Sequence, residues 1–149
     1  MLRTCAERSC PPSNGGFDGG YSLCILEGRL HYVSNHLARE HFVATSTEPV
    51  PPGAVNLRVE FEKTGEFAGK ARLYIDGREV GGCDVPRTNM VVYAVAEGLE
   101  IGSDSTSAVW PRYRPPFNFT GVIRKVEITG QSPGHSDPEG DARVARYRQ

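Results

Sequence analysis

The residues from 55 to 62 alternate strictly between apolar and polar side chains. The apolar positions are Val55, Leu57, Val59 and Phe61, and the polar positions between them are Asn56, Arg58, Glu60 and Glu62. Because successive side chains of a β-strand point to opposite faces of a sheet, this pattern predicts a strand with one buried and one solvated face. The chain is therefore expected to bury its core against β-sheet.

Short runs rich in Val, Ile, Tyr and Phe recur along the chain, each bounded by Gly, Pro, Asn or Asp. They predict strands at 21–27, 30–33, 41–45, 55–62, 71–75, 79 onward, 91–96, 99–102 and 122–129. Gly28 and the dipeptide Asp76-Gly77 mark hairpin turns, since tight turns favour residues that tolerate positive φ. About nine strands without a convincing helix exclude a parallel βαβ sheet. The pattern favours an all-β fold with two antiparallel sheets stacked as a sandwich.

The length of 149 residues is that of one typical domain. We expect an irregular leader at 1–14, a β-sandwich at 15–129 and a flexible polar tail at 130–149. The residues 48–53 contain three prolines and are expected to leave any strand ladder, because proline has no amide hydrogen to donate.

Charge and hydropathy narrow the classes of partner. Seventeen Lys and Arg against eighteen Asp and Glu give a net charge of −1, which disfavours nucleic-acid binding. No apolar run approaches the roughly 18 residues that span a bilayer, and the N-terminal residues are polar, so we expect a cytoplasmic protein without a membrane segment. The cysteines at 5, 10, 24 and 83 form no C-x-x-C pair and are interpreted as thiols.

Four segments in a fixed order carry a family resemblance. They read GGYSLCILEGRLHYVSN, STEPVPPGAVNLRVEFEKTG, ARLYIDGREVG and AEGLEIGSDSTSAVWPRYRPPFNFTGVIRKVEI. Together they resemble the C-terminal domain of large bacterial arylsulfatases, over about Gly15 to Thr129. The most specific part is Gly98 to Ile123, where glycines, prolines and aromatic residues keep the family order. The resemblance implies a concanavalin-like, laminin-G-like jelly-roll sandwich that follows a catalytic domain.

Two departures from the family pattern affect what the resemblance implies. A strand that the family carries before the segment at Gly15 is replaced by the polar leader, so the sandwich is expected to lack an edge strand. The family's catalytic motif, C/S-x-P-x-R, is also missing. Cys10 begins the nearest match, but Asn14 stands where the motif requires arginine. With no Ser-His-Asp order or paired carboxylates either, we do not expect the chain to be a hydrolase.

The candidate contact residues are grouped in one proline-rich stretch. They are Trp110, Arg112, Tyr113, Arg114 and Phe117. Aromatic rings can stack on sugars or be buried against a partner protein, and arginines can bind a sulfate or carboxylate through paired hydrogen bonds. The alternative is structural: Phe117 and Phe119 would plug the open end of the sandwich. Arg124 is a further arginine of this kind.

The sequence supports a metal site or an acid-base site less strongly than it supports these contact residues. His31, His36 and His41 are five residues apart, so consecutive ones face opposite sides of a sheet and cannot form one ligand set. Asp104 lies in a Gly-Ser-Asp-Ser turn, where its carboxylate can cap local amides or contribute to a calcium site. One aspartate does not establish calcium, and no cofactor is expected.

These observations favour a non-catalytic accessory domain related to the arylsulfatases, which are sulfuric ester hydrolases. Its role would be to pack against a catalytic sulfatase domain or a partner chain. Self-association as a homodimer is expected if the chain stands alone, because unpaired edges and apolar patches recruit partners. The alternative is a free-standing carbohydrate-binding module, in which Trp110 contacts the glycan.

Overall fold

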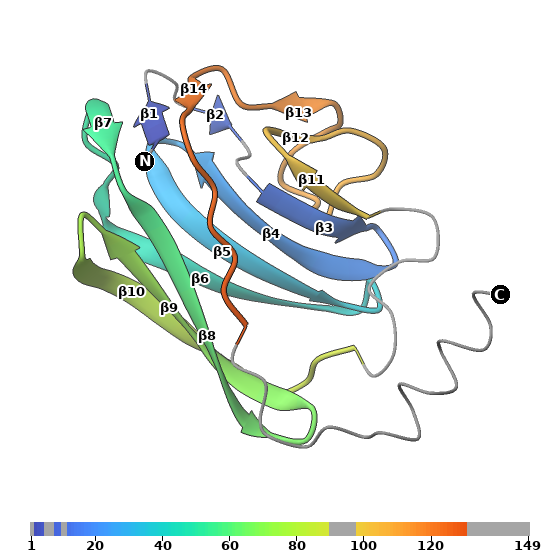
Figure 1. Ribbon diagram of the computed structural model, residues 1–149. Coiled ribbons are helices and arrows are strands. Elements are labelled where there is room, and N and C mark those ends of the chain that lie inside the picture. The colour runs from blue at the N-terminus through green and yellow to red at the C-terminus, as the bar shows by residue number, and fades with distance from the viewer. Residues whose placement is uncertain (1, 5–7, 10–11, 90–97, 131–149) are drawn as a thin grey trace, which may run out of the picture.

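The computed structural model describes residues 2–4, 8–9, 12–89 and 98–130 (Figure 1). The described residues form fourteen strands and no helix. The strands are β1 (Leu2–Thr4), β2 (Arg8–Ser9), β3 (Pro12–Gly16), β4 (Gly19–Leu26), β5 (Arg29–His36), β6 (Glu40–Pro49), β7 (Gly53–Val55), β8 (Leu57–Gly65), β9 (Ala68–Ile75), β10 (Arg78–Val85), β11 (Leu99–Ile101), β12 (Ser103–Asp104), β13 (Phe117–Asn118) and β14 (Val122–Ile123).

Two antiparallel sheets face each other (Figure 1). The larger has the order β11-β3-β4-β5-β6, with β2 also paired to β4, and the smaller has the order β10-β9-β8. Two minor sheets, β14-β1-β7 and β12-β13, complete the pairing. The predicted all-β antiparallel sandwich is confirmed.

Two tight turns set the strand register. Glu27 and Gly28 join β4 to β5 with φ of 54° and 73°, and Asp76 and Gly77 join β9 to β10 with φ of 49° and 82°. Positive φ at both central positions gives the backbone twist that matches paired strands. The Asp76 carboxylate also accepts a hydrogen bond from the Asn56 amide at 2.8 Å. The predicted Asp76-Gly77 hairpin is confirmed.

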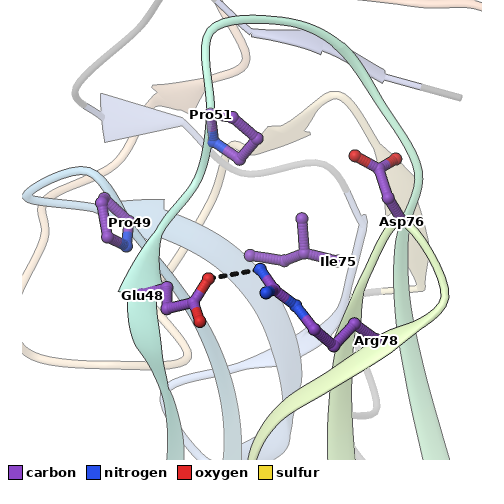
Figure 2. Close-up of a pocket in the computed structure, with 6 residues that line it drawn as sticks. All are labelled: Glu48, Pro49, Pro51, Ile75, Asp76 and Arg78. Atoms are coloured by element: carbon purple, nitrogen blue, oxygen red, sulfur yellow. Dashed lines mark hydrogen bonds and ion pairs between the residues drawn. The ribbon is translucent and has the colours of Figure 1, made fainter.

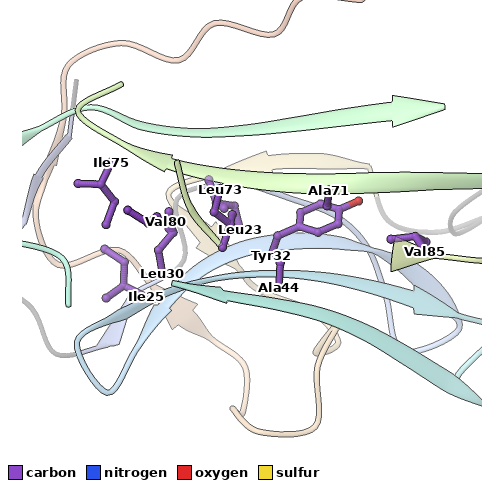
Figure 3. Packing of buried hydrophobic residues seen from close by; sticks show 10 residues of the cluster. All are labelled: Leu23, Ile25, Leu30, Tyr32, Ala44, Ala71, Leu73, Ile75, Val80 and Val85. Atoms are coloured by element: carbon purple, nitrogen blue, oxygen red, sulfur yellow. The ribbon is translucent and has the colours of Figure 1, made fainter. Parts of the chain in front are cut away.

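The main core fills the space between the two sheets (Figure 3). Its buried residues come from one face of each sheet, as strand alternation requires. They are Leu23, Ile25, Leu30, Tyr32, Ala44, Ala71, Leu73, Ile75, Val80 and Val85. Phe119 packs against the edge of this cluster.

A second apolar cluster covers the opposite, outer face of the larger sheet. Cys24 and Leu26 of β4 and Val33 of β5 point to this side, where they meet Trp110 and Tyr113 from the long connection between β12 and β13. The larger sheet is thus buried on both faces along β4 and β5. This explains why nearly every residue of these two strands is buried.

The two sheets meet closely where β6 runs beside β10. The Thr47 hydroxyl donates a hydrogen bond to the Val80 carbonyl at 3.1 Å. A Cβ built on Gly81 would lie 2.4 Å from the Thr45 carbonyl oxygen, far inside contact distance. Glycine at this position therefore allows the two backbones to approach.

Three sequence predictions are corrected by the structure. The leader is not irregular, because β1, β2 and the start of β3 lie in it, and β3 occupies a place inside the larger sheet between β11 and β4. These strands form through backbone pairing that their polar side chains do not indicate.

The other two corrections concern strand ends. β6 continues to Pro49, which is paired with Arg29 across a register irregularity. Proline is tolerated there because β6 is an edge strand of its sheet and because the ladder is already interrupted at that point. The strand expected at 122–129 is limited to Val122–Ile123, which pair with β1. Residues 124–130 form no strand or helix.

Two predicted features fall outside the described residues. They are the strand expected at 91–96 and, beyond residue 130, the tail. Within the described part of the chain, no helix is long and apolar enough to cross a membrane.

Candidate functional site

The connection between β12 and β13 carries four of the five predicted contact residues, and the fifth, Phe117, is the first residue of β13. β12 and β13 pair with each other through Ser103 with Asn118 and Asp104 with Phe117, which closes the connection into a loop. Val109, Trp110 and Tyr113 are buried, whereas Arg112 and Arg114 are exposed. The loop is therefore fixed to the sheet by its apolar side chains and presents its arginines outward.

Asp104 is the polar anchor of this loop. Its carboxylate is 2% exposed and accepts hydrogen bonds from the Tyr113 hydroxyl and from the Val109 amide, the latter at 3.2 Å. These contacts match the capping role that the sequence left open for Asp104. Among the described residues, no three His, Cys, Asp or Glu side chains gather where they could hold a metal ion.

Trp110 packs on the imidazole of His31. Their ring centroids are 5.2 Å apart, and Trp110 is only 7% exposed. His31 Nδ1 lies 3.0 Å from the Thr45 hydroxyl and Nε2 lies 3.2 Å from the Leu26 carbonyl oxygen. Burial lowers the pKa of His31 below its ordinary value. Both ring nitrogens are thus within hydrogen-bond distance of a partner, and the neutral imidazole packs against the Trp110 ring.

This burial predicts a loss of stability in acid. Well above pH 6.5 the imidazole is neutral in both the folded and the unfolded state. As the pH falls through 6.5, the unfolded chain binds the proton first, so the free energy of unfolding drops until the pH has passed the lower folded-state pKa. Chemical denaturation at pH 7.5 and 5.0 should show a smaller drop for His31→Phe than for the wild type. Equal drops in the two proteins would contradict this role of His31.

The exposed side of the loop forms a hollow of about 430 Å³. It is lined by Leu26, Pro111, Arg112, Tyr113, Arg114 and Phe117, and we call it the arginine hollow. The rings of Tyr113 and Phe117 stack within it at 4.4 Å between centroids and 14° between planes.

The two arginines of the hollow differ in their contacts. Arg112 forms an ion pair with Glu27 at 3.3 Å, and its guanidinium lies 5.2 Å from the centroid of the Trp110 ring. Arg114 is exposed and has no ion pair or side-chain hydrogen bond with the described residues. Arg114 is therefore the cation of the hollow that is available to a ligand or partner.

The remaining candidates lie partly at the hollow and partly elsewhere. Phe119 packs against the main core, which fits the structural role considered for it, whereas Phe117 packs against the outer cluster and lines the hollow. By strand alternation His31 and His41 belong to the outer face of the larger sheet and His36 to the inner face. Arg124 is exposed on the irregular chain after β14.

Sequence reasoning did not place three residues at this site, although it considered one of them, His31, as a metal or acid-base candidate. Leu26, Glu27 and His31 reach the loop from the β4–β5 hairpin, about 80 positions away in the chain. The available signal was the unbroken apolar run at residues 23–26 in the second half of β4, which indicates that both faces of the strand are covered there.

A second hollow, of about 370 Å³, lies where β6 ends beside the β9–β10 turn (Figure 2). It is lined by Glu48, Pro49, Pro51, Ile75, Asp76 and Arg78. The Arg78 guanidinium forms an ion pair with the Glu48 carboxylate across it, as Figure 2 shows. Because these two charges neutralise each other, this hollow offers no free cation comparable to Arg114; its remaining charged group among the described residues is the Asp76 carboxylate.

Comparisons with known proteins give no assignment. Neither the models of protein families nor the curated proteins contain a match to this chain.

Proposed function

We propose that this chain is a non-catalytic accessory domain, related to the concanavalin-like and laminin-G-like C-terminal domain of arylsulfatases. It packs against a catalytic domain or partner chain through the arginine hollow. One observation carries the proposal: the segment 98–123, where the resemblance is most specific, is also the segment that builds the hollow.

The composition of the hollow supports binding between proteins. Arginine and aromatic residues are enriched at protein interfaces, where a few of them supply most of the affinity. Arg112 and Arg114 flank Tyr113, which is buried and bonded to Asp104. The buried Tyr113 therefore fixes the backbone at both arginines before binding, which reduces the entropy lost on association.

The contacts of the titratable groups beneath the loop favour a structural role for them over a catalytic role. His31 has both nitrogens engaged, and the Asp104 carboxylate accepts its hydrogen bonds from within the loop. General acid-base catalysis needs such a group within reach of a substrate. We therefore expect the purified chain to hydrolyse no aryl sulfate in an assay in which an intact arylsulfatase is active.

A binding experiment tests the docking role. The chain is titrated calorimetrically into an arylsulfatase catalytic domain from the source organism, produced without its own C-terminal sandwich. We expect binding that Arg114→Glu weakens roughly tenfold or more, as at an interface hot spot. Arg39→Glu is the matched control, since Arg39 is exposed on the β5–β6 turn at the other end of the sheet. Equal affinities for the two variants would refute docking through the hollow.

The alternative function, a carbohydrate-binding module, requires an exposed aromatic platform. Trp110 and Tyr113 are buried, so a loss of binding in Trp110→Ala would reflect loss of the fold. Arg114→Ala is the more informative variant. We expect a glycan array to show no binding; binding that Arg114→Ala abolishes would support the carbohydrate-binding module instead.

We also expect the isolated chain to self-associate. Large apolar side chains are exposed on it, including Phe17 at 63% and Ile101 at 52%. Among the described residues, β8 and β11 each pair on one edge only, and unpaired edges template further pairing. Light scattering should give a mass that rises with concentration above 16.3 kDa. A constant monomer mass would contradict this expectation.

A further inference from the structure

The arginine hollow lies in a local concentration of positive charge. Arg112 and Arg114 line it, and Arg29 is paired across the β4–β5 hairpin with Leu26, another lining residue. Glu27 is the carboxylate on the same side, and it is paired with Arg112. A second carboxylate, that of Asp104, is buried beneath the loop against Tyr113. The excess of positive charge is therefore on the exposed side, where Arg112 and Arg114 face Glu27.

The three guanidinium groups are not equally available. Arg29 donates to the carbonyls of Ser46 and Thr47 at 2.9 and 2.7 Å, so it serves the β5–β6 pairing. Arg112 is held by Glu27 at a distance of 3.3 Å, which is longer than a strong charged hydrogen bond. Arg114 has no such partner among the described residues. The site thus has one free guanidinium and a second that an incoming anion can share.

The aromatic rings of the hollow distinguish between two kinds of anionic ligand. A sulfated sugar would use an open ring face for stacking, whereas a protein carboxylate needs only the guanidinium and a close apolar wall. Tyr113 and Phe117 are stacked on each other, and the Trp110 ring contacts His31 and the Arg112 guanidinium. The geometry therefore favours a protein carboxylate.

Resting on the proposed function, we infer that the partner surface seated on the arginine hollow is acidic, with an Asp or Glu carboxylate bound by Arg114 and reaching Arg112. Leu26, Pro111 and Phe117 form the apolar wall beside that carboxylate. Arginine is suited to this contact because its planar group binds both carboxylate oxygens. The inference names the chemistry of the partner, which the proposed function leaves open.

Zero-length coupling tests this pairing in the native assembly. Arg114→Lys places an amine where the guanidinium lies, and a triazine reagent that activates carboxylates then joins that amine to any carboxylate in contact with it. The variant is expressed in the source organism in its native context, coupled, digested and analysed by mass spectrometry. Arg39→Lys is the control, because it places an amine at an exposed arginine outside the hollow.

We expect an amide between position 114 and an Asp or Glu of a sulfatase-type catalytic domain, at a yield about tenfold above that for position 39. If sulfatase peptides are recovered but position 114 is not coupled to them, the acidic partner is refuted while the proposed function stands. If no sulfatase peptides are recovered, the proposed function itself fails. Coupling only to a second copy of this chain, or binding of a heparin oligosaccharide lost in Arg114→Ala, would also overturn the inference.

Discussion

Trp110→Ala lowers the free energy of unfolding by about 3–5 kcal/mol, the usual cost of removing a large buried aromatic side chain. Trp110 is 7% exposed and packs between His31 and the outer cluster around Leu26 and Val33. Its loss leaves a cavity between the loop and the sheet that neither side can fill. The melting temperature of a chain of this size should fall by roughly 10 °C.

The matched control for this prediction is Phe17→Ala. Phe17 is also a large aromatic residue, but it is 63% exposed at the β3–β4 turn. Little packing is lost there, so the change in stability should stay within about 0.5 kcal/mol. Urea denaturation of both variants and the wild type measures the difference. Equal stability of Trp110→Ala and Phe17→Ala would show that the loop does not depend on Trp110.

Gly81→Ala is expected to destabilise the sandwich by about 1–3 kcal/mol or more, the range for overpacking. The added methyl would lie 2.4 Å from the Thr45 carbonyl oxygen, a backbone atom that cannot rotate away. β10 would have to move away from β6, which weakens the hydrogen bond from Thr47 to Val80. Thermal unfolding followed by circular dichroism measures this effect.

Gly98→Ala is the control for the glycine substitution. A Cβ at Gly98 meets nothing within 4 Å, and its φ is not in the left-handed region. The same change there should leave the melting temperature unchanged or raise it slightly, because alanine restricts the unfolded chain. A fall in melting temperature at Gly98 equal to that at Gly81 would refute the close approach as the cause.

The strands of the sandwich could be predicted where side-chain alternation carries the signal. β9 alternates between buried and more exposed residues, and Asp76-Gly77 specifies the turn after it. In β8 the alternation places Leu57 and Val59 against the core, whereas Phe61 is exposed. β3 could not be predicted in this way, because its sequence PSNGG has no apolar alternation. It becomes a strand through pairing with β4 and β11, and that pairing depends on residues distant in the chain.

The candidate site shows the same division between local and distant information. Arg112, Tyr113 and Arg114 are neighbours in the sequence, and their grouping with Trp110 and Phe117 could be recognised directly. The burial of Trp110 and Tyr113 could not be recognised from the sequence. Whether an aromatic residue lies on the loop surface or beneath it depends on which face of β4 the loop covers, and that is fixed by sheet register.

The most direct test of the docking role is recovery of the chain from source cells. An antibody against the sandwich is used for immunoprecipitation, and the recovered protein is analysed by mass spectrometry and by its size on a denaturing gel. We expect peptides of a catalytic domain with the C/S-x-P-x-R motif, either in a polypeptide several times larger than 16.3 kDa or in a separate partner chain. Recovery of the 16.3 kDa chain without any such peptide would contradict the proposed accessory role.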